Sequence, residues 1–259
     1  MGFVIRCLDM LNIVCSWWGE YYGPEYVNKL YGQVKRNCSA DFRFFVQTDN
    51  PNDKLDPKIE TIPIGKYKPE QIEGDGNIWK VKYRKVWDRP KSNYWEPKFM
   101  DGLTIALDLD VVILKDLTEL LDEYDGKPLC LRSWWHDHEH RYWHKQNLGA
   151  KINGGCFIWE DCENTRRIWR DLDENWDMIS FVYKTGDNFL TWRHFDEFKL
   201  MPPKYSYSFN RGRKFPEDME IRTKQEGVLC LFNTDNGHGH IELHEAYEKY
   251  DWIKDHWHI

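Results

Sequence analysis

The chain has 259 residues, 41% of them hydrophobic and 31% charged, and this balance is typical of a folded globular protein with one large α/β domain or two small ones. Its formal net charge of −7 argues against a general nucleic-acid-binding protein. Aromatic residues make up 16% of the chain, and their rings can serve as core volume or as flat platforms for sugars and bases.

Three further features bear on the compartment. No apolar run approaches the roughly 20 residues that span a bilayer. No secretory cleavage site follows the N-terminus, and the seven cysteines include no Cys-x-x-Cys pair. We therefore expect a cytoplasmic protein with no transmembrane segment.

The first fifty residues predict a strand, a helix and a second strand. Residues 11–16 (LNIVCS) form an apolar run typical of a buried strand, and the aromatic loop WWGEYYG follows. A helix is predicted from Pro24 onward, because apolar residues then recur with 3-4-3-4 spacing and basic residues end the segment. Residues 42–48 (FRFFVQT) alternate like a strand. Together these segments predict the βαβ unit of a parallel sheet.

The central stretch is residues 103–114 (LTIALDLDVVIL), in which two apolar runs enclose Asp108 and Asp110. We expect one continuous strand, on which positions i and i+2 project to the same face, so that both carboxylates point the same way. A divalent cation is the least costly way to hold two carboxylates together. The alternative is a strand that ends in a polar turn; the apolar flanks on both sides carry no turn signal and favour the metal site.

The later segments follow the same patterns and contain no internal repeat or low-complexity linker, so we expect residues 1–259 to form a single domain. We predict helices at residues 77–88, 115–124, 165–176, from Gly186 onward and near the C-terminus, and strands at 62–64, 129–134, 152–160, 198–201, 205–210 and 228–233. An Asn-Gly-Gly turn is expected to precede the 152–160 strand. The histidines between His136 and His144 come without a HExxH motif or paired cysteines, which favours a solvated or acceptor-binding loop over a zinc site.

Taken in order, six segments resemble the GT-A fold glycosyltransferases, and more narrowly the bacterial and phage enzymes related to the glycogenin and lipopolysaccharide galactosyltransferase group. The segments are CSWWGEYYGPEYVNKLYGQVKRN, FRFFVQTDNP, ALDLDVVIL, NGGCFIWE, GDNFLTW and VLCLFNT. A DxD motif alone is a weak signal, but this ordered set covers most of the chain and is strong. The resemblance implies a Rossmann-like α/β fold with a mixed, mostly parallel sheet flanked by helices. It also implies a hexosyltransferase that moves a sugar from a nucleoside-diphosphate sugar, expected to be a UDP-sugar, to a glycan or other hydroxyl acceptor.

The resemblance also implies how the donor is held. Asp108 and Asp110 would hold Mn²⁺ or Mg²⁺, which binds the diphosphate of the donor. The aromatic loop would stack the base, although any of its rings could equally be a core residue; the rings are those of Trp17, Trp18, Tyr21 and Tyr22. A basic segment would contact the diphosphate, unless it is only a solvated helix face; its residues are Tyr83, Arg84 and Lys85.

The sugar-side residues follow from the same resemblance. Asn153, Gly154 and Gly155 match the segment that lines the sugar pocket, although Asn-Gly is also a common turn pair. Asp187 and Asn188 match the first two positions of the DQD segment of the family, where the acid contacts the sugar and the amide lies near the reacting carbon. Phe189 departs from that segment at its third position, and Asp187 could instead be only a helix cap. The third metal ligand of the family is a histidine; here Asn233 stands at the matching place, and His238 or His240 is the alternative.

Two other classes of protein share some of these features. A phosphatase of the haloacid-dehalogenase type would use Asp108 as nucleophile and Asp110 as general acid. About a hundred residues precede this motif, and the GDN segment lacks the second acid that such an enzyme needs. A sugar-binding module without catalysis would suit the aromatic content, but it would not require paired acids on a central strand.

Overall fold

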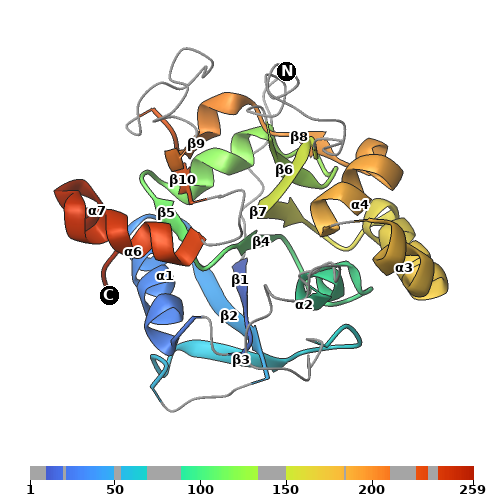
Figure 1. Ribbon diagram of the computed structural model, residues 1–259, viewed down its shortest axis with the longest axis horizontal. Helices are drawn as coiled ribbons and strands as arrows, with labels where there is room; N and C mark the ends of the chain where they lie inside the picture. Colours follow the sequence, from blue (N-terminus) through green and yellow to red (C-terminus); the bar gives the residue numbers. More distant parts are fainter. Residues whose placement is uncertain are drawn as a thin grey trace.

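The computed structural model describes residues 10–19, 22–49, 54–68, 89–133, 150–183, 185–210, 226–232 and 239–259, with side chains from residue 243 onward in the last range. Within these residues the chain forms a seven-stranded sheet and a three-stranded sheet with helices around them (Figure 1). The large sheet contains β1 (Leu11–Trp17), β2 (Phe42–Thr48), β3 (Ile59–Pro63), β4 (Thr104–Leu107), β6 (Leu129–Arg132), β7 (Ile152–Trp159) and β8 (Lys199–Leu200). The small sheet contains β5 (Val111–Ile113), β9 (Ser206–Ser208) and β10 (Leu229–Leu231).

Helices surround both sheets in the described ranges. The α-helices are α1 (Pro24–Arg36), α2 (Arg89–Ser92), α3 (Glu163–Val182), α4 (Gly186–Arg193), α6 (Gly239–Lys249) and α7 (Asp251–His256). The 3-10 helices are η1 (Asn93–Trp95), η2 (Leu117–Glu123), η5 (Phe195–Glu197) and η6 (Pro203–Tyr205). In the described part of the chain, no helix has the length and apolarity needed to cross a membrane.

The predicted βαβ unit is confirmed. All seven residues of β1 are buried, and β1 pairs in parallel with β2 from Leu11 opposite Phe42 to Trp17 opposite Thr48. The helix α1 begins at Pro24 and buries the apolar face that its sequence spacing predicted. A parallel pair of strands requires such a crossover helix, and this is why the three segments fold together.

The large sheet has the strand order β3-β2-β1-β4-β7-β6-β8. Strand β7 runs antiparallel to its neighbours β4 and β6, while the other pairs are parallel, so the expected mixed and mostly parallel sheet is confirmed. The chain order reverses at β1, which has β2 on one side and β4 on the other. Ligands of open α/β sheets bind beyond the carboxyl ends of the strands at such a reversal.

The expectation of one continuous strand over residues 103–114 is wrong. Strand β4 ends at Leu107, residues 109 and 110 form a turn, and β5 begins at Val111 in the small sheet. Both apolar runs are buried, but β4 pairs with β1 and β7 whereas β5 pairs with β10. The amide of Gln33, from α1, holds β5 in place by accepting a hydrogen bond from the Ile113 N–H at 2.8 Å.

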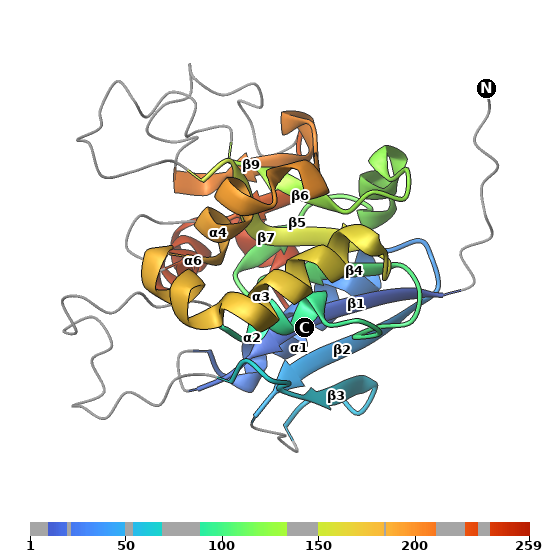
Figure 2. The same ribbon diagram turned by 90° about the vertical axis from the view of Figure 1, so that its right-hand side faces the viewer.

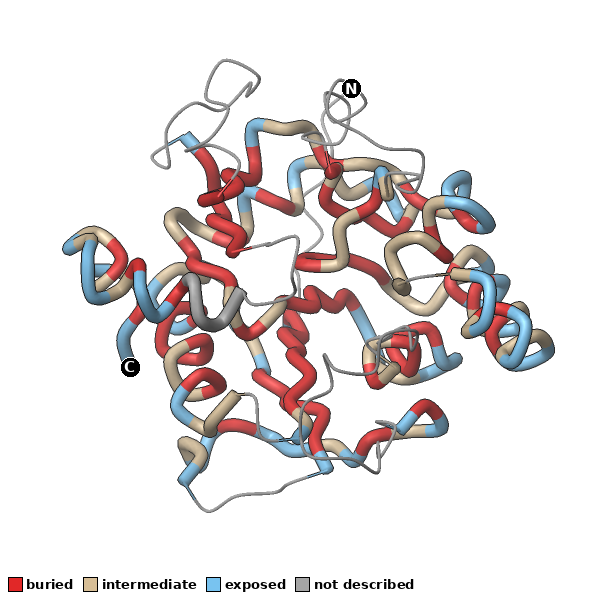
Figure 3. Tube along the Cα trace, in the orientation of Figure 1, coloured by how far each residue is buried: buried red, intermediate tan, exposed pale blue. Residues whose placement is uncertain are grey.

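Two apolar clusters cover the two faces of the large sheet. One joins α1, the small sheet, α6 and α7, and the other joins η1, α3 and α4. Figures 1 and 2 show these two groups of helices on opposite sides of the sheet. In Figure 3 the strands are largely buried, and exposed residues lie on the outer faces of the helices.

Several later elements differ from the expected ones in extent. The predicted 165–176 helix is part of the longer α3, the expected C-terminal helix is divided into α6 and α7 at Tyr250, and the 115–124 segment forms the 3-10 helix η2. The Asn-Gly-Gly segment lies inside β7 instead of forming a turn before it. The predicted 77–88 helix lies outside the described residues.

Candidate active site: two acidic groups around a strand bulge

The Asp108 and Asp110 carboxylates are brought close by the turn between β4 and β5, and not by the pleat of one strand. The hydroxyl of Tyr22 donates a hydrogen bond to Asp110 Oδ2 at 2.9 Å. Burial, and then the charge of Asp108, raises the pKa of Asp110 to about 7. Burial and the Asp110 carboxylate in turn raise the pKa of Tyr22 far above its ordinary value, so this phenol stays a hydrogen-bond donor.

Asp108 has two further contacts. Its carboxylate forms an ion pair with the ammonium of Lys91, on the short helix α2. Its backbone N–H donates to the carbonyl oxygen of Gly155 on β7 at 3.2 Å. Asp108 is therefore attached to both the basic helix before β4 and the neighbouring antiparallel strand.

Strand β7 bulges beside Asp108. Cys130 of β6 pairs with Phe157, but the next residue, Leu131, pairs with Asn153, so three residues of β7 have no partner on β6. The Asn153 side chain closes the bulge by accepting a hydrogen bond from the Gly155 N–H at 3.0 Å. Bulges of this kind re-aim a strand and are frequent beside active sites.

The two glycines of the bulge leave room for neighbouring side chains. A Cβ atom on Gly154 would lie 2.7 Å from Asp187 Oδ1, and a Cβ atom on Gly155 would lie 2.9 Å from Asn153 Oδ1, with Asp108 Oδ2 in ordinary contact at 3.8 Å. Any side chain at Gly154 would therefore displace Asp187. Asp108 of the DxD motif and Asp187 of the GDN segment, which are far apart in the sequence, therefore both lie near this backbone segment.

Asp187 lies in the first turn of α4, but it is not the N-cap of that helix. Thr185 is the N-cap, because its hydroxyl accepts a hydrogen bond from the Asn188 N–H at 3.2 Å. The Thr185 hydroxyl also lies 3.1 Å from Asn188 Oδ1 and donates to it. Asp187 is therefore not needed as the cap of α4. The two hydrogen bonds between Asn188 and Thr185 form that cap.

The far end of α4 is held on two sides. The hydroxyl of Thr191 accepts hydrogen bonds from the backbone N–H groups of Lys151 and Ile152, at 3.1 and 3.2 Å, where β7 begins. Asp171 of α3 accepts two hydrogen bonds from Arg193, both at 2.6 Å, and lies 2.8 Å from His194 Nε2. Burial lowers the pKa of His194 even though the Asp171 carboxylate opposes this shift. These contacts fix α4, and hence Asp187, relative to β7.

A cleft of about 180 Å³ lies beside Asp108, Asp187 and the glycines of the bulge, whereas Asp110 is not among its lining residues. Its lining includes polar side chains, among them those of Asp108 and Asp187, and apolar ones. The described lining residues are Lys91, Ser92, Trp95, Asp108, Asn153, Gly154, Gly155, Phe157, Leu172, Thr185, Gly186, Asp187, Phe189 and Leu190. Asn188 is not among them.

Two aromatic residues of the predicted aromatic loop, Trp17 and Tyr22, have contacts other than those expected of a stacking platform. Trp17 is only 2% exposed and donates its indole N–H to the Tyr22 carbonyl oxygen at 2.6 Å, so its ring is a core residue. Tyr22 uses its hydroxyl on Asp110. Trp18 is half-buried. The base-binding role therefore remains a prediction for Trp18 and for Tyr21, which lies outside the described residues.

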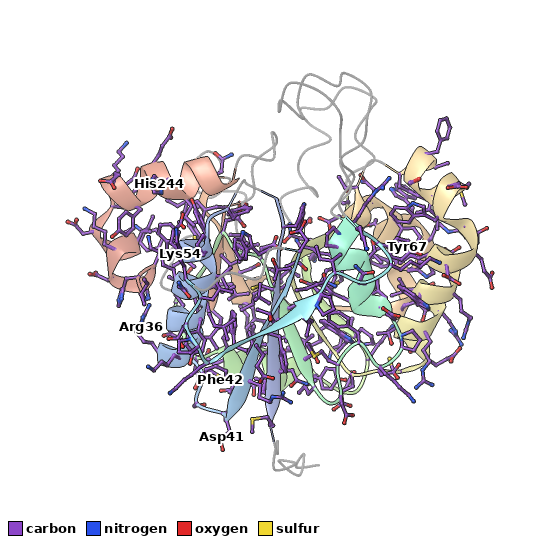
Figure 4. The ribbon with its side chains drawn as sticks, turned by 90° about the horizontal axis from the view of Figure 1, so that it is seen from below. Arg36, Asp41, Phe42, Lys54, Tyr67 and His244 are labelled. Atoms are coloured by element: carbon purple, nitrogen blue, oxygen red, sulfur yellow. The ribbon has the colours of Figure 1, made fainter. Side chains whose placement is uncertain are left out.

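Several other predicted site residues lie outside the described residues. These residues are Tyr83, Arg84, Lys85, Asn233, His238 and the histidines from His136 to His144. The side chain of His240 is also not described. His244 lies on α6 with its ring 6.3 Å from that of Trp257. Figure 4 shows it on the opposite side of the molecule from Tyr67, whose ring packs against Trp169 and Trp176 of α3.

The sequence did not single out Lys91 or the Asp171 contacts. Lys91 lies 17 positions before its partner Asp108, in a segment (RPKS) with no recognisable motif. In the sequence Asp171 is one of several acidic residues along α3, and its contact with Arg193 forms only when the two helices pack together. Neither partnership has a spacing that a single sequence reveals.

The donor atoms present fit a hard divalent cation. Asp108 and Asp110 offer carboxylate oxygens, which Mg²⁺ and Mn²⁺ prefer. Burial, and then the charge of Asp108, raises the pKa of Asp110, so a cation at this pair would stabilise its ionised form. Within the described ranges, no third histidine, cysteine or acid joins them. The expected third ligands, Asn233 and His238, lie outside those ranges.

Structural comparison identifies the fold. The structure of LgtC, a galactosyltransferase with donor and acceptor sugar analogues, superimposes with a TM-score of 0.56 at 13% identity over 92% of this chain and 95% of that one. An active-site mutant of LgtC gives 0.57 at 14% identity over 85% and 86%. The glycosyltransferase GlyE of Streptococcus pneumoniae TIGR4 gives 0.56 at 11% identity over 86% of this chain, which spans only 55% of that protein. No protein-family model and no curated protein matches at the level of sequence. The GT-A fold that the motifs implied is therefore confirmed.

Proposed function

We propose that the chain is a metal-dependent glycosyltransferase that moves a sugar from a nucleoside-diphosphate sugar, of the UDP-sugar class, to a hydroxyl of a glycan or another acceptor. The proposal takes residues 1–259 as one catalytic domain. The observation that carries it is the cleft that Asp108, Asp187 and the Gly154–Gly155 bulge line together. The GT-A fold favours this function over the phosphatase alternative.

In the proposed function, Asp108 and Asp110 hold Mn²⁺ or Mg²⁺. When bound, such a cation supplies positive charge that binds the diphosphate and stabilises it as a leaving group. The hydrogen bond from the Tyr22 hydroxyl keeps the Asp110 carboxylate in a fixed orientation. The backbone bond from Asp108 to Gly155 keeps the other carboxylate beside the bulge.

The transfer breaks the bond between the anomeric carbon and the phosphate oxygen, and the electron pair leaves with the nucleoside diphosphate. A new bond forms between the anomeric carbon and the acceptor oxygen, which loses its proton. Positive charge develops on the sugar ring during this exchange, and a nearby carboxylate stabilises it. We assign this role to Asp187, which also orients the sugar hydroxyls. The apolar lining residues, including Trp95 and Phe157, would exclude water from the donor.

Donor cleavage tests the proposal. The purified protein with Mn²⁺ should slowly hydrolyse one member of a panel of nucleotide sugars, and the same donor should raise the melting temperature only when Mn²⁺ is present. Asp187→Asn should lower this turnover about a hundredfold while nucleotide affinity stays near that of the wild type. Because Thr185 caps α4, the melting temperature of the variant should not fall.

Two results would contradict the proposal. A protein that binds sugars but neither binds nor cleaves any nucleotide sugar would be a binding module. An Asp187→Asn variant with full turnover would remove Asp187 from the chemistry.

A further inference from the structure

Each carboxylate of the DxD pair already has a partner without a metal ion. Asp108 forms its ion pair with Lys91, and Asp110 accepts the Tyr22 hydroxyl. The side chains of Lys91 and Asp108 are 21% and 28% exposed, so the pair is partly shielded from water. Among the described residues that line the cleft, Lys91 is the only basic one.

The Lys91 ammonium contacts the same carboxylate that would hold the cation. A divalent ion that binds Asp108 must displace this ammonium or share the carboxylate with it, and like charges at such short range repel strongly in a partly buried site. With metal alone, the displaced ammonium would lose its contact with Asp108, remain beside a divalent cation and gain no phosphate oxygen. With a diphosphate present, both cations gain phosphate oxygens.

We infer that Lys91 makes metal binding depend on the nucleotide. Its ammonium pairs with the Asp108 carboxylate in the metal-free protein and contacts the diphosphate instead when metal and donor bind together. The inference rests on the proposed function, since it needs a metal and a diphosphate in this cleft. It makes Lys91 a residue that suppresses binding of the metal alone and binds the diphosphate once metal and donor are both present. By thermodynamic linkage, the nucleotide must raise the affinity for the metal by the same factor by which the metal raises the affinity for the nucleotide.

Calorimetric titration with Mn²⁺, with and without UDP, measures this coupling directly and does not require activity. In the wild type, UDP should tighten Mn²⁺ binding by a factor in the usual range for coupled sites, roughly 5–150-fold. Lys91→Met should bind Mn²⁺ alone several-fold more tightly than the wild type, and its coupling factor should be several-fold smaller. Lys91→Arg keeps the positive charge and should restore the weak binding of metal alone.

A matched control is Lys66→Met. Lys66 also forms an ion pair with an aspartate, Asp173, but both side chains are about half exposed and neither residue lines the cleft. This variant has the same change in net charge, so unchanged Mn²⁺ affinity and coupling would show that the Lys91 effect is local. Thermal melting of all variants checks that each is folded.

The outcomes separate the inference from the proposed function. If the wild type shows coupling and Lys91→Met binds Mn²⁺ alone no more tightly, the inference is wrong and the proposed function stands. If neither protein binds Mn²⁺ or UDP under any condition, both are wrong. If Lys91→Met gains affinity for Mn²⁺ alone and Lys91→Arg does not, the inference holds.

Discussion

Substitution of Gly154 by alanine tests the close approach of the bulge to Asp187. The added methyl group would lie 2.7 Å from Asp187 Oδ1, whereas ordinary contacts begin near 3.4 Å. The carboxylate must therefore retreat by roughly 0.7 Å, or the bulge must shift by as much. Because α4 is held by β7 and by Asp171, the helix cannot simply move away.

The expected consequence is a loss of turnover with nucleotide binding preserved. A misplacement of about 1 Å at a reacting centre can cost around a hundredfold, so we expect Gly154→Ala to lose about 10–100-fold in kcat, or ~1.4–2.7 kcal/mol. Overpacking should also cost about 1–3 kcal/mol of unfolding free energy. Affinity for UDP with Mn²⁺ should stay within about twofold of the wild type, since we propose that the diphosphate binds at Asp108 and Asp110.

A double-mutant cycle with Asp187→Ala isolates the cause. If the methyl group acts by displacing the carboxylate, Gly154→Ala should have almost no further effect on turnover once that carboxylate is absent. Steady-state kinetics of donor hydrolysis for the wild type, both single variants and the double variant give the coupling. Full activity of Gly154→Ala, or equal losses in both backgrounds, would refute the steric argument.

Three other predictions follow from the described contacts. Asp110→Asn should abolish Mn²⁺-dependent UDP binding. The pKa of Asp110 in the folded protein, about 7, lies above that of an unfolded aspartate, so the free energy of unfolding of the wild type should fall as pH rises from about 4 to 7. Chemical denaturation of the variant should show no such fall. Asp171→Asn should loosen α4 and cost ~1.5–3 kcal/mol of unfolding free energy with reduced kcat, whereas Asp173→Asn, at an exposed pair on the same helix, should stay within about 0.5 kcal/mol. Trp17→Ala should lower the free energy of unfolding by about 3–5 kcal/mol, because the ring is buried. Tyr21→Ala should cost roughly 1–3 kcal/mol of nucleotide affinity if that ring stacks the base, and an unchanged calorimetric affinity for UDP would place the base elsewhere.

The sequence predicted those features that depend on neighbours along the chain. The apolar run of β1, the helix that begins at Pro24 and the alternation of β2 each have a periodicity of their own, and all three elements form where expected. The order of the DxD, Asn-Gly-Gly and GDN segments indicated the fold, because a family preserves the order in which its motifs occur along the chain. The structure adds that these segments meet at one cleft.

The tertiary structure decided how those segments meet, because the deciding partners are distant in sequence. The apolar run after Asp110 has the composition of a continuing strand, yet its backbone pairs with β10, more than a hundred residues later, and this pairing forces the turn that joins the two carboxylates. Similarly, the Asn-Gly-Gly segment by itself predicts a turn. It forms a bulge inside β7 instead, because β7 has three more residues than β6 at the point where their register shifts. The ion pair of Lys91 with Asp108 and the contacts of Asp171 with α4 also arise only when separate elements pack. Local periodicity determines whether a segment is a helix or a strand, whereas the choice of sheet, the register and the charge partners depends on burial and pairing that no single segment contains.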